Sequence, residues 1–144
     1  MNLSIEKAII QDAEAVYELI CDLENTQYSK VLFTEMFETN FNNPQIGYFV
    51  AKLNEFTVGF GSIYINKLLH HCGNIAEIQE LIVSNEYRNK NIGNNIVRKM
   101  IEWSEKQEAL QVEVTCNITR TKAHQFYKAN GFIHTHQKLV LKLE

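Results

Sequence analysis

The sequence predicts a mixed α/β fold in which a largely antiparallel sheet of six or seven strands carries helices on both faces. The chain has 144 residues, about the length of one domain, so we treat residues 1–144 as a single unit. Segments of alternating apolar residues are interleaved with segments whose apolar residues recur every three or four positions. Two alternating segments meet near Asn54-Glu55, as in an antiparallel hairpin.

The expected strands are alternating or β-branched segments bounded by turn residues. They cover residues 1–10, 45–53, 56–65, 74–83, 110–117 and 132–143. Gly59 and Gly61 reduce the side-chain content of the third of these strands. The fourth is rich in isoleucine and valine, which indicates a buried position in the sheet.

The expected helices carry their apolar residues on one face. They cover the segment that follows Asp12 and residues 29–42, 92–108 and 119–129. In the second helix Phe33, Phe37 and Phe41 recur every four residues, and we interpret them as core packing rather than as the wall of a pocket. The core stripe of the third helix consists of Ile92, Ile96, Met100 and Trp103.

Composition and charge exclude several classes of protein. A hydrophobic fraction of 45% with 22% charged residues is typical of an ordinary globular domain. The net charge is −3 and no basic stripe occurs, so we expect no nucleic-acid partner. Cys21, Cys72 and Cys116 lie far apart without a CxxC pair, which favours reduced thiols. Neither a leader nor about 18 consecutive apolar residues occur, so we expect a soluble, cytoplasmic protein with no membrane partner.

The turn between the strand 74–83 and the helix 92–108 has the features of an anion site. Free backbone N–H groups at a helix N-terminus, together with Arg88 and Lys90, favour a phosphate or pyrophosphate. Gly93 permits close approach to the backbone, and Asn91 is a residue type that accepts a positive φ. A solvated loop with a helix cap fits the same residues equally well. Sites for nucleoside triphosphates and dinucleotides are disfavoured, because neither GxxxxGK[ST] nor GxGxxG followed by an acidic residue occurs.

Two segments of the chain resemble the GNAT acetyltransferase superfamily. Arg88-Asn89-Lys90-Asn91-Ile92-Gly93 resembles the family's [QR]-x-x-G-x-[GA] turn, with Asn91 in place of the first glycine. Asn117 ends the strand after the long helix, as in the family. The segment Ala123-His124-Gln125-Phe126-Tyr127-Lys128-Ala129-Asn130-Gly131-Phe132 is similar to the family's A-x-x-F-Y-x-x-x-G-F.

More narrowly, three segments resemble the aminoalkylphosphonate N-acetyltransferases of phosphonate metabolism. They are Leu69-His70-His71, Glu77-Ile78-Gln79-Glu80-Leu81-Ile82-Val83 and residues 120–127. The similarity extends over nearly the whole chain. It implies that acetyl-CoA is the co-substrate and that the acetyl group passes directly to the primary amine of a small aminoalkylphosphonate.

The resemblance also implies which residues bind acetyl-CoA. The pyrophosphate would be bound by backbone N–H groups of the turn, contributed by Arg88, Asn89, Lys90, Asn91, Ile92, Gly93 and Asn94. The pantetheine arm would make strand-like hydrogen bonds along Leu81, Ile82 and Val83, with Asn117 and Tyr127 beside it. One of the strand N–H groups would hold the thioester carbonyl and stabilise the charge that develops on it.

The acceptor amine needs a base, because an alkylammonium group has a pKa near that of Lys, about 10.4. Glu77 stands where a glutamate acts as base in several members of the superfamily, and Glu80 is the second candidate. Three positions apart, the two side chains point to opposite faces of a strand unless a bulge intervenes. Tyr127 resembles the family's general acid, although an aromatic residue beside Phe126 is also consistent with simple packing.

An anionic phosphonate requires cationic or hydrogen-bonding groups. The candidates are Lys30, His70, His71, Arg120, His136 and Lys138. The adjacent histidines before an acidic strand also raise the question of a divalent metal held with Glu77 or Glu80. We do not expect one, because adjacent strand residues point to opposite faces and no full ligand set is visible.

Two other functions compete with this hypothesis. The same chemistry on a polyamine or an aminoglycoside would require an acidic pocket, and no dense acidic cluster occurs beyond Glu77 and Glu80. A non-catalytic module that only binds acetyl-CoA would bind the coenzyme without releasing a thiol in the presence of amines. Homodimers are common for such folds, but no feature of the sequence decides the oligomeric state.

Overall fold

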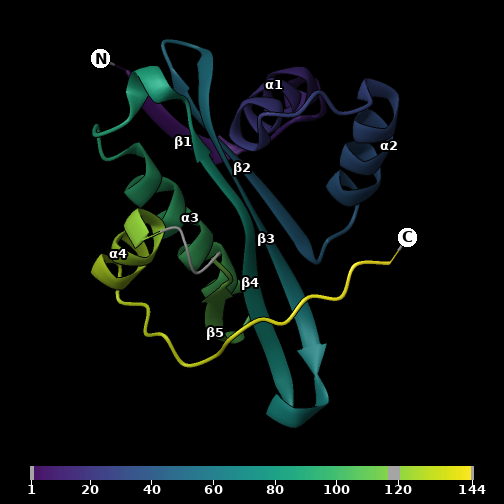
Figure 1. Cartoon of the computed structure of the whole chain (residues 1–144), viewed down its shortest axis with the longest axis vertical. Coiled ribbons are helices and arrows are strands. Elements are labelled where there is room, and N and C mark those ends of the chain that lie inside the picture. The colour runs from purple at the N-terminus through teal and green to yellow at the C-terminus, as the bar shows by residue number, and fades with distance from the viewer. Residues whose placement is uncertain (1, 117–120, 144) are drawn as a thin grey trace.

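Figure 1 shows the computed structural model of the chain, in which residues 2–116 and 121–143 are described. Five strands form one sheet in the order β1-β2-β3-β4-β5. Their bounds are β1 Leu3–Lys7, β2 Ile46–Leu53, β3 Phe56–Leu68, β4 Gly73–Val83 and β5 Ala109–Val114. Neighbouring strands are antiparallel except β4 and β5, which are parallel because α3 connects them.

The helices cover both faces of this sheet (Figure 1). Their bounds are α1 Ala13–Glu24, α2 Lys30–Phe41, α3 Ile92–Lys106 and α4 Thr121–Ala129. On one face α1 and α2 pack on a cluster that includes Val16, Phe37 and Ile82. On the other face α3 and α4 pack on a cluster around Ile96 and Met100. The predicted α/β class, with helices on both faces of a largely antiparallel sheet, is confirmed.

Asp12 stands at the N-cap position of α1, but its side chain makes no capping hydrogen bond to that helix. Asp12 precedes α1, accepts the N–H of Ile9 at 2.8 Å and pairs with Lys52 at 3.1 Å. In α2 the predicted aromatic row stacks with ring centroids 6.3 Å apart, and Phe37 packs on Tyr48 at 4.9 Å. This row is core packing, as interpreted, although its last ring, Phe41, remains 38% exposed.

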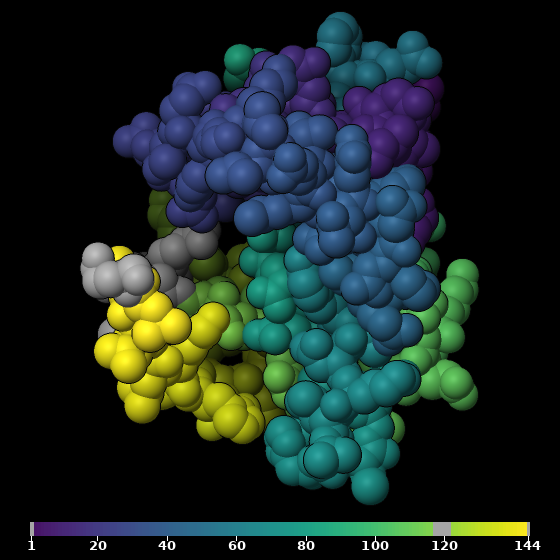
Figure 2. Space-filling model, turned by 90° about the vertical axis from the view of Figure 1, so that its right-hand side faces the viewer, coloured from purple at the N-terminus to yellow at the C-terminus, as the bar shows by residue number. Residues whose placement is uncertain are grey.

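The segment 132–143 does not form the predicted strand. It has no strand pairing, and its residues Leu139, Leu141 and Leu143 are 93%, 86% and 89% exposed. The sheet of the described residues therefore has five strands instead of six or seven. Alternation specifies which side chains share a face, but pairing also requires a neighbouring edge at the right place. Figures 1 and 2 show this tail crossing the sheet on the side of α1 and α2.

Gly61 allows α3 to lie close to the sheet. A Cβ at this position would lie 2.6 Å from Cγ2 of Ile96 and 3.0 Å from Cε of Met100. Both of these side chains are fully buried, so neither has room to move away. The bare backbone of β3 at this point is therefore required by the packing of the helix on the sheet.

We predict that Gly61→Ala lowers the free energy of unfolding by about 1 to 3 kcal/mol through overpacking. Gly93→Ala is the matched control, because its Cβ would meet Phe126 at 3.4 Å, an ordinary contact. The control should keep or slightly raise the stability, by up to about 1 kcal/mol, since alanine is favoured in a helix. Urea unfolding measures both values, and equal stability of the two variants would contradict the packing argument.

Candidate active site

The turn that follows β4 ends in the first turn of α3, whose first backbone N–H groups have no acceptor within the helix. Asn91 is the N-cap of α3 with φ 64°, and Asn89 has φ 65°. The first backbone bond at this helix start runs from the N–H of Asn95 to the carbonyl of Asn91, at 3.2 Å. The N–H groups of Ile92, Gly93 and Asn94 thus have no acceptor within the helix, and they form its electropositive end. This geometry suits a phosphate group.

The side chains of this turn from Arg88 to Asn91 are exposed to solvent. The Nε of Arg88 donates to the carbonyl of Val83 at 3.3 Å, which folds Arg88 back across the turn. Asn89, Lys90 and Asn91 are exposed. The structure thus brings the predicted turn residues together around one helix start.

An asparagine chain ties α4 to this turn. The Nδ2 of Asn130 donates to Oδ1 of Asn94 at 2.8 Å and to the carbonyl of Phe126 at 2.9 Å. The Nδ2 of Asn94 in turn donates to Oδ1 of the N-cap Asn91. The sequence analysis named Asn130 only within the segment that resembles the family and missed this link. An asparagine beside the helix-ending Gly131 carried no signal of a contact 36 residues away.

Beyond Ile78, β4 is paired along one edge only within the described part of the chain. The parallel pairing of β4 with β5 ends at Ile78 and Val114, whereas β4 continues to Val83. Leu81, Ile82 and Val83 keep their antiparallel partners on β3. Among the described residues, the other backbone edge of residues 79–83 has no strand partner, so it can receive an extended amide chain.

A bulge places both predicted catalytic carboxylates on one face of the sheet. The register pairs Ser62 with Glu80 but Ile63 with Ile78, so Gln79 is the extra residue. Ile78 therefore faces the α3 cluster, while Glu80 points to the face covered by α1 and α2, together with Glu77. The sequence analysis had left this point open, because alternation alone sends the two side chains to opposite faces.

Glu80 lies near the beginning of the part of β4 that is paired with β3 but not with β5. Its carboxylate is hydrogen-bonded to Ser62. The Ser62 hydroxyl donates to Oε1 of Glu80, and its oxygen accepts the backbone N–H of Glu80 at 3.0 Å. Burial raises the pKa of the Glu80 carboxyl above its usual value, an effect that the Ser62 hydrogen bond opposes in part and the charge of Glu24 increases. A carboxylate in such surroundings is suited to proton abstraction near neutral pH.

Two tyrosines and one asparagine extend this polar cluster, and the sequence analysis assigned them no role. The Nδ2 of Asn40 in α2 donates to the hydroxyl of Tyr48 at 2.8 Å and to that of Tyr64 at 3.1 Å. Burial is the main cause that raises the pKa of both tyrosines, and the charge of Glu80 adds to it. Only the placement of polar residues on otherwise apolar strands hinted at this cluster.

Glu77 lies three residues before Glu80, in the part of β4 that is paired with both β3 and β5. It is opposite Tyr64 on β3 and opposite Glu113 on β5. The hydroxyl of Thr115 donates to Oε2 of Glu77 at 3.4 Å. Three carboxylates, those of Glu77, Glu80 and Glu113, thus lie on the same face of neighbouring strands.

The remaining predicted residues lie at four separate places. Tyr127 on α4 is partly buried, with its ring centroid 5.1 Å from Phe126 and 5.5 Å from Phe132. Lys30 is paired with Glu14 at 2.6 Å at the start of α2. His136 and Lys138 are exposed on the tail 132–143. Two predicted residues, Asn117 and Arg120, lie outside the described residues.

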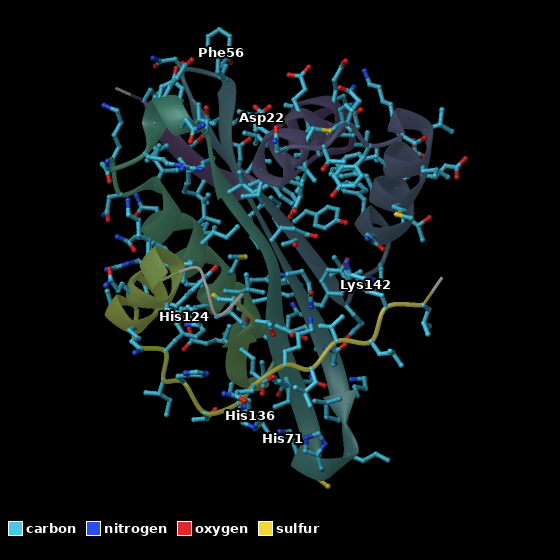
Figure 3. All side chains as sticks on the ribbon, viewed as in Figure 1. Asp22, Phe56, His71, His124, His136 and Lys142 are labelled. Atoms are coloured by element: carbon cyan, nitrogen blue, oxygen red, sulfur yellow. The ribbon has the colours of Figure 1, made fainter. Side chains whose placement is uncertain are left out.

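The histidine pair lies away from the carboxylates. His70 and His71 follow β3 at the tip of the β3–β4 hairpin, with ring centroids 4.4 Å apart. Four strand residues, 65–68, separate Tyr64, opposite Glu77, from this tip, a span of about 13 Å. Figure 3 shows His71 at the tip and His136 and Lys142 on the tail. Within residues 2–116 and 121–143, no three His, Cys, Asp or Glu side chains gather as metal ligands.

A search for helices of the length and apolarity needed to cross a membrane finds none in the described part of the chain. Figure 2 shows the molecule hollowed between the yellow tail and the teal strands, on the side where α1 and α2 lie. The carboxylate face of β4 is on this same side.

The chain is similar to known acetyltransferases. The sequence profile of the acetyltransferase (GNAT) family matches residues 13–132. An aminoalkylphosphonate N-acetyltransferase from Salmonella typhimurium is 33% identical over 132 residues, which cover 92% of this chain and 86% of that protein.

Solved structures share the fold. A transcriptional regulator from Bacillus halodurans superposes with a TM-score of 0.91 at 22% identity, over 99% of this chain and 100% of that one. The aminoglycoside N-acetyltransferase AAC(6')-Iy, in complex with CoA, superposes with a TM-score of 0.89 at 13% identity, over 99% and 95% of the two chains. The chain therefore belongs to the acetyltransferase (GNAT) family and is an acetyl-CoA-dependent N-acetyltransferase.

Proposed function

We propose that the protein transfers the acetyl group of acetyl-CoA directly to the primary amine of a small aminoalkylphosphonate. The observation that carries this proposal is the position of Glu80, a half-buried carboxylate at the point where β4 loses its β5 partner. The 33% identity to an aminoalkylphosphonate N-acetyltransferase supports this choice of acceptor.

The residues present fit the co-substrate. The free N–H groups at the start of α3 suit its pyrophosphate, and the open edge of residues 79–83 suits its pantetheine amides. When bound, acetyl-CoA supplies the activated thioester. A backbone N–H of this open edge would donate to the thioester carbonyl oxygen, on which negative charge builds up during attack.

We assign the base to Glu80 in preference to Glu77. Glu80 adjoins Leu81 on the open edge, whereas Glu77 lies where β4 is paired with β5. Ser62 fixes the orientation of the Glu80 carboxylate, and burial raises its pKa toward the range in which a carboxylate abstracts protons well. Tyr127 remains the proposed acid for the departing thiolate, a role that rests on the family resemblance.

The two ends of the acceptor would meet opposite charges. The ammonium end suits Glu80 and Glu77, and the phosphonate end suits the cations of the tail that crosses the same face. Those cations are Lys138 and Lys142, with His136 as a further donor. Lys30, His70, His71 and Arg120 remain in the proposed set of substrate-binding residues from the sequence.

A second candidate acceptor is a small polyamine or aminoglycoside. One observation favours it: Glu113 adds a third carboxylate beside Glu77 and Glu80. Such a surface attracts a polycation and disfavours a dianion that lacks a cationic partner.

An acceptor panel is the first experiment. We expect release of the free thiol of CoA when acetyl-CoA is mixed with 2-aminoethylphosphonate or aminomethylphosphonate, and weaker release with spermidine and an aminoglycoside. Colorimetric thiol detection measures the rates. A preference for spermidine would favour the second candidate. Binding of acetyl-CoA by calorimetry without thiol release for any amine would indicate a non-catalytic binding module.

The raised pKa of Glu80 predicts the pH dependence of the reaction. Only the ionised carboxylate accepts a proton, so kcat/KM should fall as the pH drops through a pKa above that of an ordinary carboxyl group. Glu80→Gln should lower kcat by about 100-fold or more and abolish the fall of kcat/KM at low pH, the acid limb of the pH profile. Glu77→Gln is the matched control and should retain the limb; the reverse pattern would transfer the base role to Glu77.

Stability provides an independent check on Glu80. Its pKa is raised in the folded protein, so its favourable contribution is present when it is protonated and is lost as the pH rises through the folded pKa. Above that pH, Glu80→Gln should therefore unfold at an equal or higher urea concentration than the wild type while its activity is low. A large loss of stability would instead indicate that the carboxylate is structural.

The positive φ of Asn91 predicts how the turn responds to substitution. Asn91→Gly should keep or improve acetyl-CoA affinity, because glycine adopts φ 64° without strain. Asn91→Val should weaken it by about 10-fold or more, since a β-branched residue opposes this conformation and moves the N–H groups of α3. Calorimetric Kd values for CoA compare the two, and equal affinities would contradict the proposed pyrophosphate site.

A further inference from the structure

The hydroxyl of Tyr64 is held in a fixed hydrogen-bonding orientation. The single Nδ2 of Asn40 donates one hydrogen to Tyr48 at 2.8 Å and the other to Tyr64 at 3.1 Å. Both hydroxyl groups therefore lie beside the same amide nitrogen and act as acceptors toward it. Asn40 belongs to α2, whereas Tyr48 and Tyr64 lie on β2 and β3, so three elements meet at this point.

The Tyr64 hydroxyl keeps a hydrogen that it can donate. Its oxygen accepts one hydrogen from Asn40, and its own hydrogen is available for another acceptor. Tyr48 is 8% exposed and holds its hydroxyl against the same amide nitrogen. Burial is the main cause that raises the pKa of both tyrosines, so both hydroxyl groups stay protonated near neutral pH.

No side chain described in the structure takes that hydrogen. The carboxylate of Glu80 is hydrogen-bonded to Ser62, and within the described residues it is hydrogen-bonded to neither tyrosine. Tyr64 is only partly buried, and it lies on the same face as Glu80 and directly opposite Glu77. Its O–H is therefore a donor beside the proposed base, on the face where the acceptor amine would lie.

We propose that Tyr64 is a specificity-determining residue whose O–H donates to an oxygen of the acceptor amine, and that Asn40 and Tyr48 are its positioning residues. This inference rests on the proposed amine N-acetyltransferase reaction and on Glu80 as its base. The favoured acceptors are amines that carry an oxygen a few bonds from the nitrogen, as a phosphonate or as a sugar hydroxyl.

Matched substrates test this assignment. For 2-aminoethylphosphonate, Tyr64→Phe should raise KM and lower kcat/KM by about 10- to 100-fold, the effect of losing a hydrogen bond to a charged oxygen. For propylamine, which has a methyl group in place of the phosphonate, kcat/KM should change less than about twofold. Glucosamine distinguishes the two oxygen classes: a loss with glucosamine alone assigns Tyr64 to hydroxyl recognition. Tyr28 is an exposed tyrosine in the loop before α2. Its substitution Tyr28→Phe should leave kcat/KM unchanged for both 2-aminoethylphosphonate and propylamine.

Asn40→Asp tests the positioning role with almost no change in shape. A carboxylate accepts hydrogens from both tyrosines, so it would turn the Tyr64 hydrogen inward and away from the substrate. We expect the same selective loss with 2-aminoethylphosphonate as in Tyr64→Phe, with kcat for propylamine retained. Uniform losses with all amines would instead indicate a purely structural role, and unchanged selectivity in both variants would overturn the inference.

Binding without turnover separates this inference from the reaction on which it rests. Calorimetry of 2-aminoethylphosphonate with the CoA-saturated protein should give a Kd about 10-fold or more higher for Tyr64→Phe than for the wild type. Circular dichroism confirms that the variants are folded. If no amine supports thiol release, the proposed reaction is wrong, and a preserved difference in Kd would still support recognition by Tyr64. Equal Kd values would reject the role of Tyr64 whether or not the reaction occurs.

Discussion

The site depends on one constraint of the sheet, which is that β4 is longer than the partner on its parallel edge. Pairing with β5 ends at Ile78, and among the residues that the structure describes the remaining backbone up to Val83 is paired only with β3. An unpaired stretch within a sheet binds other extended chains readily, so it has to be protected or used. Here it leads from the electropositive start of α3 to the carboxylate of Glu80. In the proposed function, the binding of an extended amide chain and proton abstraction would thus share one strand.

The bulge at Gln79 decides the face of the sheet on which Glu80 lies. Without the extra residue, Glu80 would point toward the α3 cluster, where Ile78 and Ala76 are buried. A carboxylate there would have to be desolvated among apolar side chains, at a large cost in free energy. With the bulge, Glu80 reaches the polar face and finds the Ser62 hydroxyl. The local loss of regular pairing is therefore compensated by the placement of one functional group.

The sequence was sufficient for local structure and insufficient for the relations between distant segments. Asp12, Ser29 and the aromatic row of α2 are local signals, and the helices begin and end close to where these signals place them. The end of the β4–β5 pairing and the bulge depend on register between strands, which a single-strand pattern does not encode. Contacts such as Asn40 to Tyr64, 24 residues apart, depend on how α2 packs on the sheet. The strand predicted at residues 132–143 was wrong for the same reason, because alternation does not show whether a neighbouring strand edge is available for pairing.

The distribution of charge limits which acceptors the site can discriminate. Glu77, Glu80 and Glu113 lie on one face and would repel an isolated anion, while burial already makes ionisation of Glu80 costly. An acceptor with its own ammonium group compensates for this, because the cation lies between the carboxylates and the anion. The proposed donor Tyr64 lies beside these carboxylates, and as a neutral hydroxyl it would add no charge to the cluster. A neutral hydroxyl therefore allows recognition of an oxygen close to Glu80 without lowering the basicity that proton abstraction requires.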